Sequence, residues 1–88
     1  MPVMLTHEEI VATVRRLAAA QVCVDPATVA LETEFHRDLG YDSLDDVEFV
    51  MQLEEAFELT ISDDEAQSVK SVGRAVELVL AALHTKDR

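Results

Sequence analysis

The sequence lacks most of the residues that cross-link or sharply bend a small protein. It contains one cysteine, Cys23, which excludes an internal disulfide and a zinc site built from several thiolates. Two glycines and two prolines in 88 residues leave few of the turns that β-hairpins need. Aromatic residues are also scarce, with one tyrosine, three phenylalanines and no tryptophan. These absences favour a fold built from helices over one built from a sheet.

Basic residues are few, and this restricts the partners of the protein. Seven lysines and arginines oppose eighteen aspartates and glutamates, so the net charge is −11. Nucleic acid and anionic membrane surfaces would repel such a chain, whereas basic patches on partner proteins would attract it in a salt-sensitive way. The same charge is also typical of a solvated surface with a negative bias. Charge alone leaves both interpretations open.

Long apolar runs are missing as well. The first residues, MPVMLTHEE, have neither the basic start nor the apolar run of a signal peptide. We therefore expect a cytoplasmic monomer without membrane insertion. We also expect one small domain over residues 1–88, which buries only about 60–65% of its unfolded surface and has no room for a deep substrate cleft beside its core.

The sequence contains several patterns that are typical of helix starts. Thr6 can cap a helix, and Glu9 three residues later completes a capping box. Leu5 and Ile10 have the spacing of a hydrophobic staple around this cap. Apolar residues then recur every three or four positions, which predicts a helix over residues 7–21.

Residues 22–41 show no sustained period. Asp25 and Pro26 are typical of a turn, and Gly40 allows a tight approach to the next helix. Four spaced apolar residues can anchor this connection to a core: Val29, Leu31, Phe35 and Leu39. A connection of about twenty residues is unusual in a compact domain and is often functional.

Three capping residues, Asp42, Ser62 and Ser71, each precede a further helical pattern. The predicted helices cover residues 43–58, 63–69 and 72–83. The sequence therefore predicts an all-α fold, a small four-helix bundle with one short helix and a long loop between the first two helices.

The helix over 43–58 has two apolar faces when it is projected at about 100° per residue. The face expected to point into the core carries Phe49, Val50, Leu53, Ala56 and Phe57. A second apolar strip carries Leu44, Val47 and Met51, and acids border it at Glu48, Glu54, Glu55 and Glu58. This strip either packs on the last helix or the long loop, or it is a docking surface whose charged rim steers basic partners.

Ser43 occupies the first position of this helix in the stretch LGYDSLDD. Backbone N–H groups at a helix start have no intrahelical partners, and the helix dipole favours negative charge there. A phosphate attached to the Ser43 hydroxyl would therefore be well placed. Asp42 and Asp45 would either push a flexible phosphate-bearing arm outward through like-charge repulsion or tolerate it with help from a metal ion.

The stretch LGYDSLDDVEFVMQLEEAF resembles the motif of acyl carrier proteins, in which Asp-Ser-Leu begins an acidic second helix. The resemblance continues through ISDDEA and SVGRAVELVL and covers nearly the whole chain. It implies that the chain is not an enzyme and has no catalytic or metal site. It also implies a 4′-phosphopantetheine arm, which a separate phosphopantetheinyl transferase, the holo-carrier synthase, transfers from coenzyme A. The terminal thiol of this arm would hold acyl groups as thioesters.

By position in this motif, Ser43 would be the attachment residue, with Asp42 and Leu44 as its neighbours. The residues that would contact partner enzymes are Asp45, Val47, Glu48, Met51, Glu54 and Glu55. The implied partners are the transferase, acyltransferases, ketosynthases and related enzymes of fatty-acid or polyketide biosynthesis with basic patches. Tyr41, Phe49 and Ser62 depart from the usual pattern of fatty-acid carriers, and GYDSL also resembles carriers of aromatic polyketide pathways.

Four other functions compete with this interpretation. A hydrolase would need the strand and the Gly-x-Ser-x-Gly turn that place a nucleophile, and Asp45 replaces the second glycine, so we interpret His36 as a solvated loop residue. A calcium-binding hand would need alternating aspartates and a closing glutamate, which are missing. A peptidyl carrier is closely related, but the acidic helix is less typical of it. The alternative that remains is an unmodified acidic interaction module that docks through the same helix.

Overall fold

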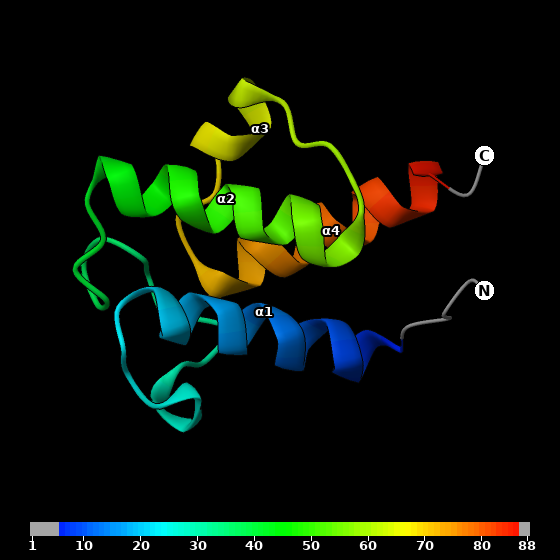
Figure 1. The fold of residues 1–88 in the computed structure, drawn as a ribbon. Coiled ribbons are helices and arrows are strands. Elements are labelled where there is room, and N and C mark those ends of the chain that lie inside the picture. Colours follow the sequence, from blue (N-terminus) through cyan, green and yellow to red (C-terminus); the bar gives the residue numbers. More distant parts are fainter. Residues whose placement is uncertain (1–5, 87–88) are drawn as a thin grey trace.

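The computed structural model describes residues 6–86 and contains four α-helices and one short 3₁₀ helix (Figure 1). The elements are α1 (His7–Gln21), η1 (Pro26–Thr28), α2 (Ser43–Phe57), α3 (Asp63–Gln67) and α4 (Val72–Lys86). The predicted all-α bundle with one short helix is thus confirmed. Compared with the prediction, α2 ends one residue earlier, α3 ends two residues earlier, and α4 is longer.

The helix starts follow from the capping residues. At α1, the Glu9 amide donates to the Thr6 hydroxyl (3.1 Å) and the Thr6 amide donates to the Glu9 carboxylate (2.9 Å), so the capping box is confirmed. Ser62 and Glu65 form the same arrangement at α3. Leu5, the other half of the predicted staple, lies outside the described residues.

The core lies between α1, α2 and α4, which contact one another (Figure 1). The residues of these helices that are buried include Ile10, Val14 and Ala18 of α1, Phe49, Leu53 and Phe57 of α2, and Val72, Val76 and Val79 of α4. Their spacing of three or four positions is the helical period that the sequence pattern indicates. None of the helices within residues 6–86 combines the length and the apolar character needed to cross a bilayer.

The long loop between α1 and α2 is pinned to the start of α4. Phe35 donates its amide to the Lys70 carbonyl (3.0 Å), and the Val72 amide donates to the Thr33 carbonyl (2.9 Å). Gly73 donates to the Leu31 carbonyl at 2.7 Å, and a Cβ at Gly73 would lie only 3.1 Å from that oxygen. Glycine therefore permits this close backbone approach.

Two predictions about apolar side chains are wrong. Leu31 is expected to anchor the loop through its side chain, but the residue is 45% exposed, and it contacts α4 through its backbone carbonyl. Ala56 was expected to face the core, but it is exposed. The neighbours of α2 cover the narrow seam of Phe49, Leu53 and Phe57, and Ala56 lies beside this seam. Val50 is half-buried against the core.

The second apolar strip of α2 is mostly exposed to solvent. Leu44 is 63% exposed, and Val47 and Met51 are each 56% exposed. The alternative that this strip packs on α4 or on the long loop is therefore wrong. What remains is an exposed apolar strip on an acidic helix.

Candidate functional site

Ser43 is the first residue of α2, and its hydroxyl makes no hydrogen bond with any described residue. Asp42 performs the capping instead, since its carboxylate accepts from the Asp45 amide at 2.9 Å. The Asp45 carboxylate in turn accepts from the Asp42 amide at 3.1 Å, which completes a capping box made of two aspartates. Ser43 is exposed and is not required for starting the helix.

Tyr41 fixes the chain just before Ser43. It is buried, its ring contacts those of Phe35 and Phe49, and its hydroxyl donates to the Ala18 carbonyl at 2.8 Å. Ala18 belongs to the last four residues of α1, whose carbonyls lack partners within a helix. Burial, followed by the negative charges of Asp45 and Asp46, raises the pKa of the Tyr41 hydroxyl above its usual value.

We expect Tyr41→Phe to lower the free energy of unfolding by about 0.5–1.5 kcal/mol near neutral pH, because the Ala18 carbonyl loses its donor. The folded state holds the hydroxyl proton more tightly than the unfolded state does. This stabilisation is therefore complete below about pH 10, the unfolded pKa, and is lost as the pH rises further. Urea unfolding of both proteins across alkaline pH is the measurement.

The difference in unfolding free energy between wild type and Tyr41→Phe should become smaller above about pH 10. Tyr41 is the only tyrosine in the chain, so tyrosinate absorbance reports its ionisation directly. A difference in stability that is constant across alkaline pH would contradict a buried, proton-donating hydroxyl at Tyr41.

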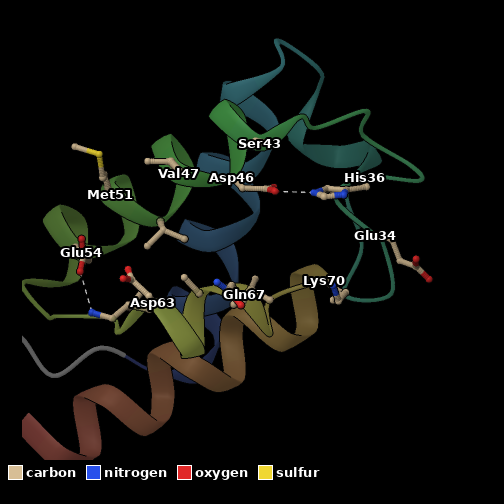
Figure 2. Close-up of a pocket in the computed structure, with 14 residues that line it drawn as sticks. Glu34, His36, Ser43, Asp46, Val47, Met51, Glu54, Asp63, Gln67 and Lys70 are labelled. Atoms are coloured by element: carbon tan, nitrogen blue, oxygen red, sulfur yellow. Dashed lines mark hydrogen bonds and ion pairs between the residues drawn. The ribbon is translucent and has the colours of Figure 1, made fainter.

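A groove of about 850 Å³ lies between α2, α3 and the loop before α2 (Figure 2). Ser43 is among its lining residues. Its apolar lining residues are Val47, Val50, Met51, Ile61, Ala66 and Val69. Its charged and amide lining residues are Glu34, His36, Asp46, Glu54, Asp63, Gln67 and Lys70. The groove therefore combines apolar side chains with polar groups next to the Ser43 hydroxyl.

His36 reaches across the groove from the loop to α2, as Figure 2 shows, and its Nε2 lies 2.7 Å from the Asp46 carboxylate. His36 is exposed, as predicted for a solvated loop residue, but no sequence pattern indicated Asp46 as its partner. Asp46 and Ser43 do not form a catalytic triad with it, because the Ser43 hydroxyl makes no hydrogen bond with the imidazole. His36 therefore does not activate the Ser43 hydroxyl in this structure.

The acids of the predicted rim differ in their surroundings. Glu48 and Glu55 are exposed, while Glu54 is half-buried and its carboxylate accepts from the Ile61 amide at 2.8 Å. Glu54 therefore holds the connection between α2 and α3 as well as lining the groove. Within the described part of the chain, no three His, Cys, Asp or Glu side chains are arranged to hold a metal ion.

Gln21, which the sequence did not single out, contacts two of the predicted partner-binding acids. Its side-chain nitrogen lies 2.9 Å from the Asp45 carboxylate and 2.7 Å from the Glu48 carboxylate. The hydrogen bond from Gln21, and then the bond from the Asp42 amide, lowers the pKa of Asp45 below its usual value.

Comparisons with known proteins agree on one kind of molecule. Residues 12–79 match the family described as "Phosphopantetheine attachment site". An "Acyl carrier protein" of Cyanidium caldarium is 39% identical over 83 residues, which cover 94% of this chain and 96% of that protein. The solved structure of an acyl carrier protein from Enterococcus faecalis is similar with a TM-score of 0.75 and 29% identity, covering 89% of this chain and 99% of that one.

Proposed function

The chain belongs to the acyl carrier protein family and carries acyl groups on 4′-phosphopantetheine, and from this premise we propose that Ser43 is the attachment residue, next to Asp42 and Leu44. The observation that carries the proposal is the free, exposed hydroxyl of Ser43 at the start of α2. Because Asp42 already caps the helix, this hydroxyl is available for a covalent bond. Unpaired amides and the helix dipole at this position stabilise the phosphodiester charge.

The residues around Ser43 fit such a group. When bound, the arm supplies a terminal thiol that forms thioesters with acyl groups. The exposed hydroxyl leaves room for the arm, and the apolar residues Val47, Val50 and Ile61 line a groove beside it. These side chains favour contact with the apolar part of an acyl chain through removal of surface from water.

Attachment is a transfer of a phosphoryl group. The Ser43 oxygen forms a bond to the phosphorus next to pantetheine in coenzyme A, and the pyrophosphate bond breaks. Adenosine 3′,5′-bisphosphate leaves, and the hydroxyl proton passes to a base of the transferase. Catalysis belongs to this partner and to the acyltransferases and ketosynthases that use the loaded chain, so the chain itself is not an enzyme.

The experiment that tests the proposal is incubation with coenzyme A and a broad-specificity phosphopantetheinyl transferase. We expect the intact mass to rise by one arm, and peptide mapping to localise the added mass to Ser43. An unchanged mass with several such transferases would favour the alternative, an unmodified acidic module that docks through α2. An added mass on another residue would overturn the assignment of Ser43.

The exposed strip of α2 is the proposed docking face for these partner enzymes. Leu44, Val47 and Met51 provide apolar contacts, and Asp45, Glu48 and Glu55 provide the charged rim. Met51 is suited to several partners because its thioether is flexible. The net charge of −11 supports partners with basic patches and opposes nucleic acid and anionic membranes. We further propose that the chain acts as a cytoplasmic monomer.

Reversing two charges of this face should slow the modification of Ser43. We expect Glu48→Lys with Glu55→Lys to lower the rate of arm transfer by roughly tenfold or more at low salt, since each reversal removes an attraction and adds a repulsion. Single reversals should be mild, because an exposed pair contributes only ~0.2–1 kcal/mol. Glu54 is left unchanged because it also binds the Ile61 amide.

The matched control is Glu8→Lys with Glu77→Lys, which makes the same change of net charge on α1 and α4. Rates are compared at low and high salt after circular dichroism has shown that both variants are folded. Equal slowing of the two double variants would mean that bulk charge alone steers the encounter and that α2 is not the docking face.

A further inference from the structure

Gln21, the last residue of α1, uses its side-chain amide to connect two helices. The nitrogen donates to the carboxylates of Asp45 (2.9 Å) and Glu48 (2.7 Å), and the oxygen accepts from the Gln52 side chain (3.0 Å). An amide nitrogen has two hydrogens and an amide oxygen accepts, so this orientation satisfies all three contacts at once. The three hydrogen bonds together fix the side chain of Gln21.

The same contacts restrain the Glu48 carboxylate and add a further restraint to the Asp45 carboxylate. Asp45 and Glu48 are three residues apart on α2, so their like charges lie on neighbouring positions of one helix face and repel each other. A donor shared between them offsets this repulsion and fixes both carboxylates. The aspartate is held a second time by the Asp42 amide at 3.1 Å.

The side-chain amide of Gln21 is an uncharged hydrogen-bond donor, and a positively charged donor at this position would affect the two acids differently. A lysine or arginine at this position would neutralise the acids and compete with the basic side chains of a partner. The amide of Gln21 holds both carboxylates in place and leaves both negative charges for the partner. Restricting side chains before binding lowers the entropy cost of docking.

We propose that Gln21 is a positioning residue for partner docking, which holds Asp45 and Glu48 in the arrangement that a basic side chain of the partner meets. The proposal rests on the proposed function of the α2 face as the docking surface. Gln21 itself is half-buried at the end of α1 and acts through the two acids.

The test is Gln21→Met, which keeps the length of the side chain and removes the amide donor. With coenzyme A saturating, we expect the KM of a phosphopantetheinyl transferase for the carrier to rise about threefold to tenfold, and kcat to stay unchanged. The control Ala20→Met puts the same side chain on the exposed neighbouring position of α1 and should keep the wild-type KM.

A double-mutant cycle separates positioning from a general change in structure. In a Glu48→Ala background, one of the two positioned acids is gone. The change in log KM caused by Gln21→Met should therefore be less than about half of the change that it causes in the wild-type background. The salt dependence of the rate should be the same for wild type and Gln21→Met, since the charge is unchanged. Circular dichroism and urea unfolding check that each variant is folded.

The outcomes distinguish this proposal from the one on which it rests. If wild type is not modified at all, the proposed function is wrong. If wild type is modified, three results would overturn the positioning role and leave the attachment role standing. These results are an unchanged KM for Gln21→Met, a lowered kcat with no change in KM, or a rise in KM that is as large in the Glu48→Ala background as in wild type. A raised KM that depends on Glu48 supports positioning.

Discussion

Ser43→Ala is expected to abolish attachment of the phosphopantetheine arm, because alanine has no oxygen to form the phosphodiester. Intact mass measured after incubation with coenzyme A and a phosphopantetheinyl transferase should show one added arm on the wild type and none on the variant. The substitution leaves the fold intact, because Asp42 caps α2 and the Ser43 hydroxyl makes no hydrogen bond with a described residue. Its free energy of unfolding should therefore stay within about 0.5 kcal/mol of wild type.

Ser62→Ala is the matched control, since Ser62 also lies at a helix start. Its hydroxyl accepts from the Glu65 amide at 3.2 Å, so it is the capping residue of α3. We expect this variant to accept the arm as wild type does while losing about 0.5–2 kcal/mol of stability. Ser43→Ala should therefore lose modification and keep its stability, whereas Ser62→Ala should keep modification and lose stability. An added mass on Ser43→Ala, or its loss with Ser62→Ala, would contradict the assignment.

The helices were predictable because their determinants are local. The start of α1 depends on Thr6 and Glu9, three residues apart, and the start of α2 depends on Asp42. The apolar spacing of α2 also revealed a second strip with Met51, and the structure decided between packing and exposure of that strip. Local sequence patterns were therefore enough to predict that Ser43 begins a helix and that an apolar strip lies next to it.

Contacts between distant residues were not predictable in the same way. The Nε2 of His36 pairs with Asp46 from a loop without periodic structure, and Gln21 reaches acids more than twenty positions away along the chain. Such contacts depend on how α1 and the loop approach α2, which no local pattern describes. The groove beside Ser43 was missed for the same reason, since its sides come from three separate segments.

Two departures from the pattern of fatty-acid carriers, Tyr41 and Phe49, contact each other in the folded chain. Their ring centroids lie 6.0 Å apart, and Phe35 lies 5.0 Å from Tyr41 and 4.9 Å from Phe49. All three side chains are buried. Tyr41 comes two residues before Ser43 and Phe49 belongs to α2, so we infer that this aromatic cluster stabilises the start of α2.

Phe49→Ala should accordingly cost about 3–5 kcal/mol of unfolding free energy, the range for truncating a buried phenylalanine to alanine. Small domains have about 5–15 kcal/mol in total, so the variant should unfold at a much lower urea concentration than wild type. Leu44→Ala, on the exposed strip of the same helix, is the control and should change stability by no more than about 0.5 kcal/mol.

Coupling between the two aromatic residues tests whether they act as one cluster. In a double-mutant cycle of Tyr41→Leu and Phe49→Leu, each substitution should cost less once the other is present, with an interaction energy of about 0.5–1.5 kcal/mol. Leucine keeps an apolar side chain at each position and removes the ring contact. Additive losses would mean that the two rings are buried independently, and that Tyr41 stabilises the approach to Ser43 mainly through its hydroxyl and the Ala18 carbonyl.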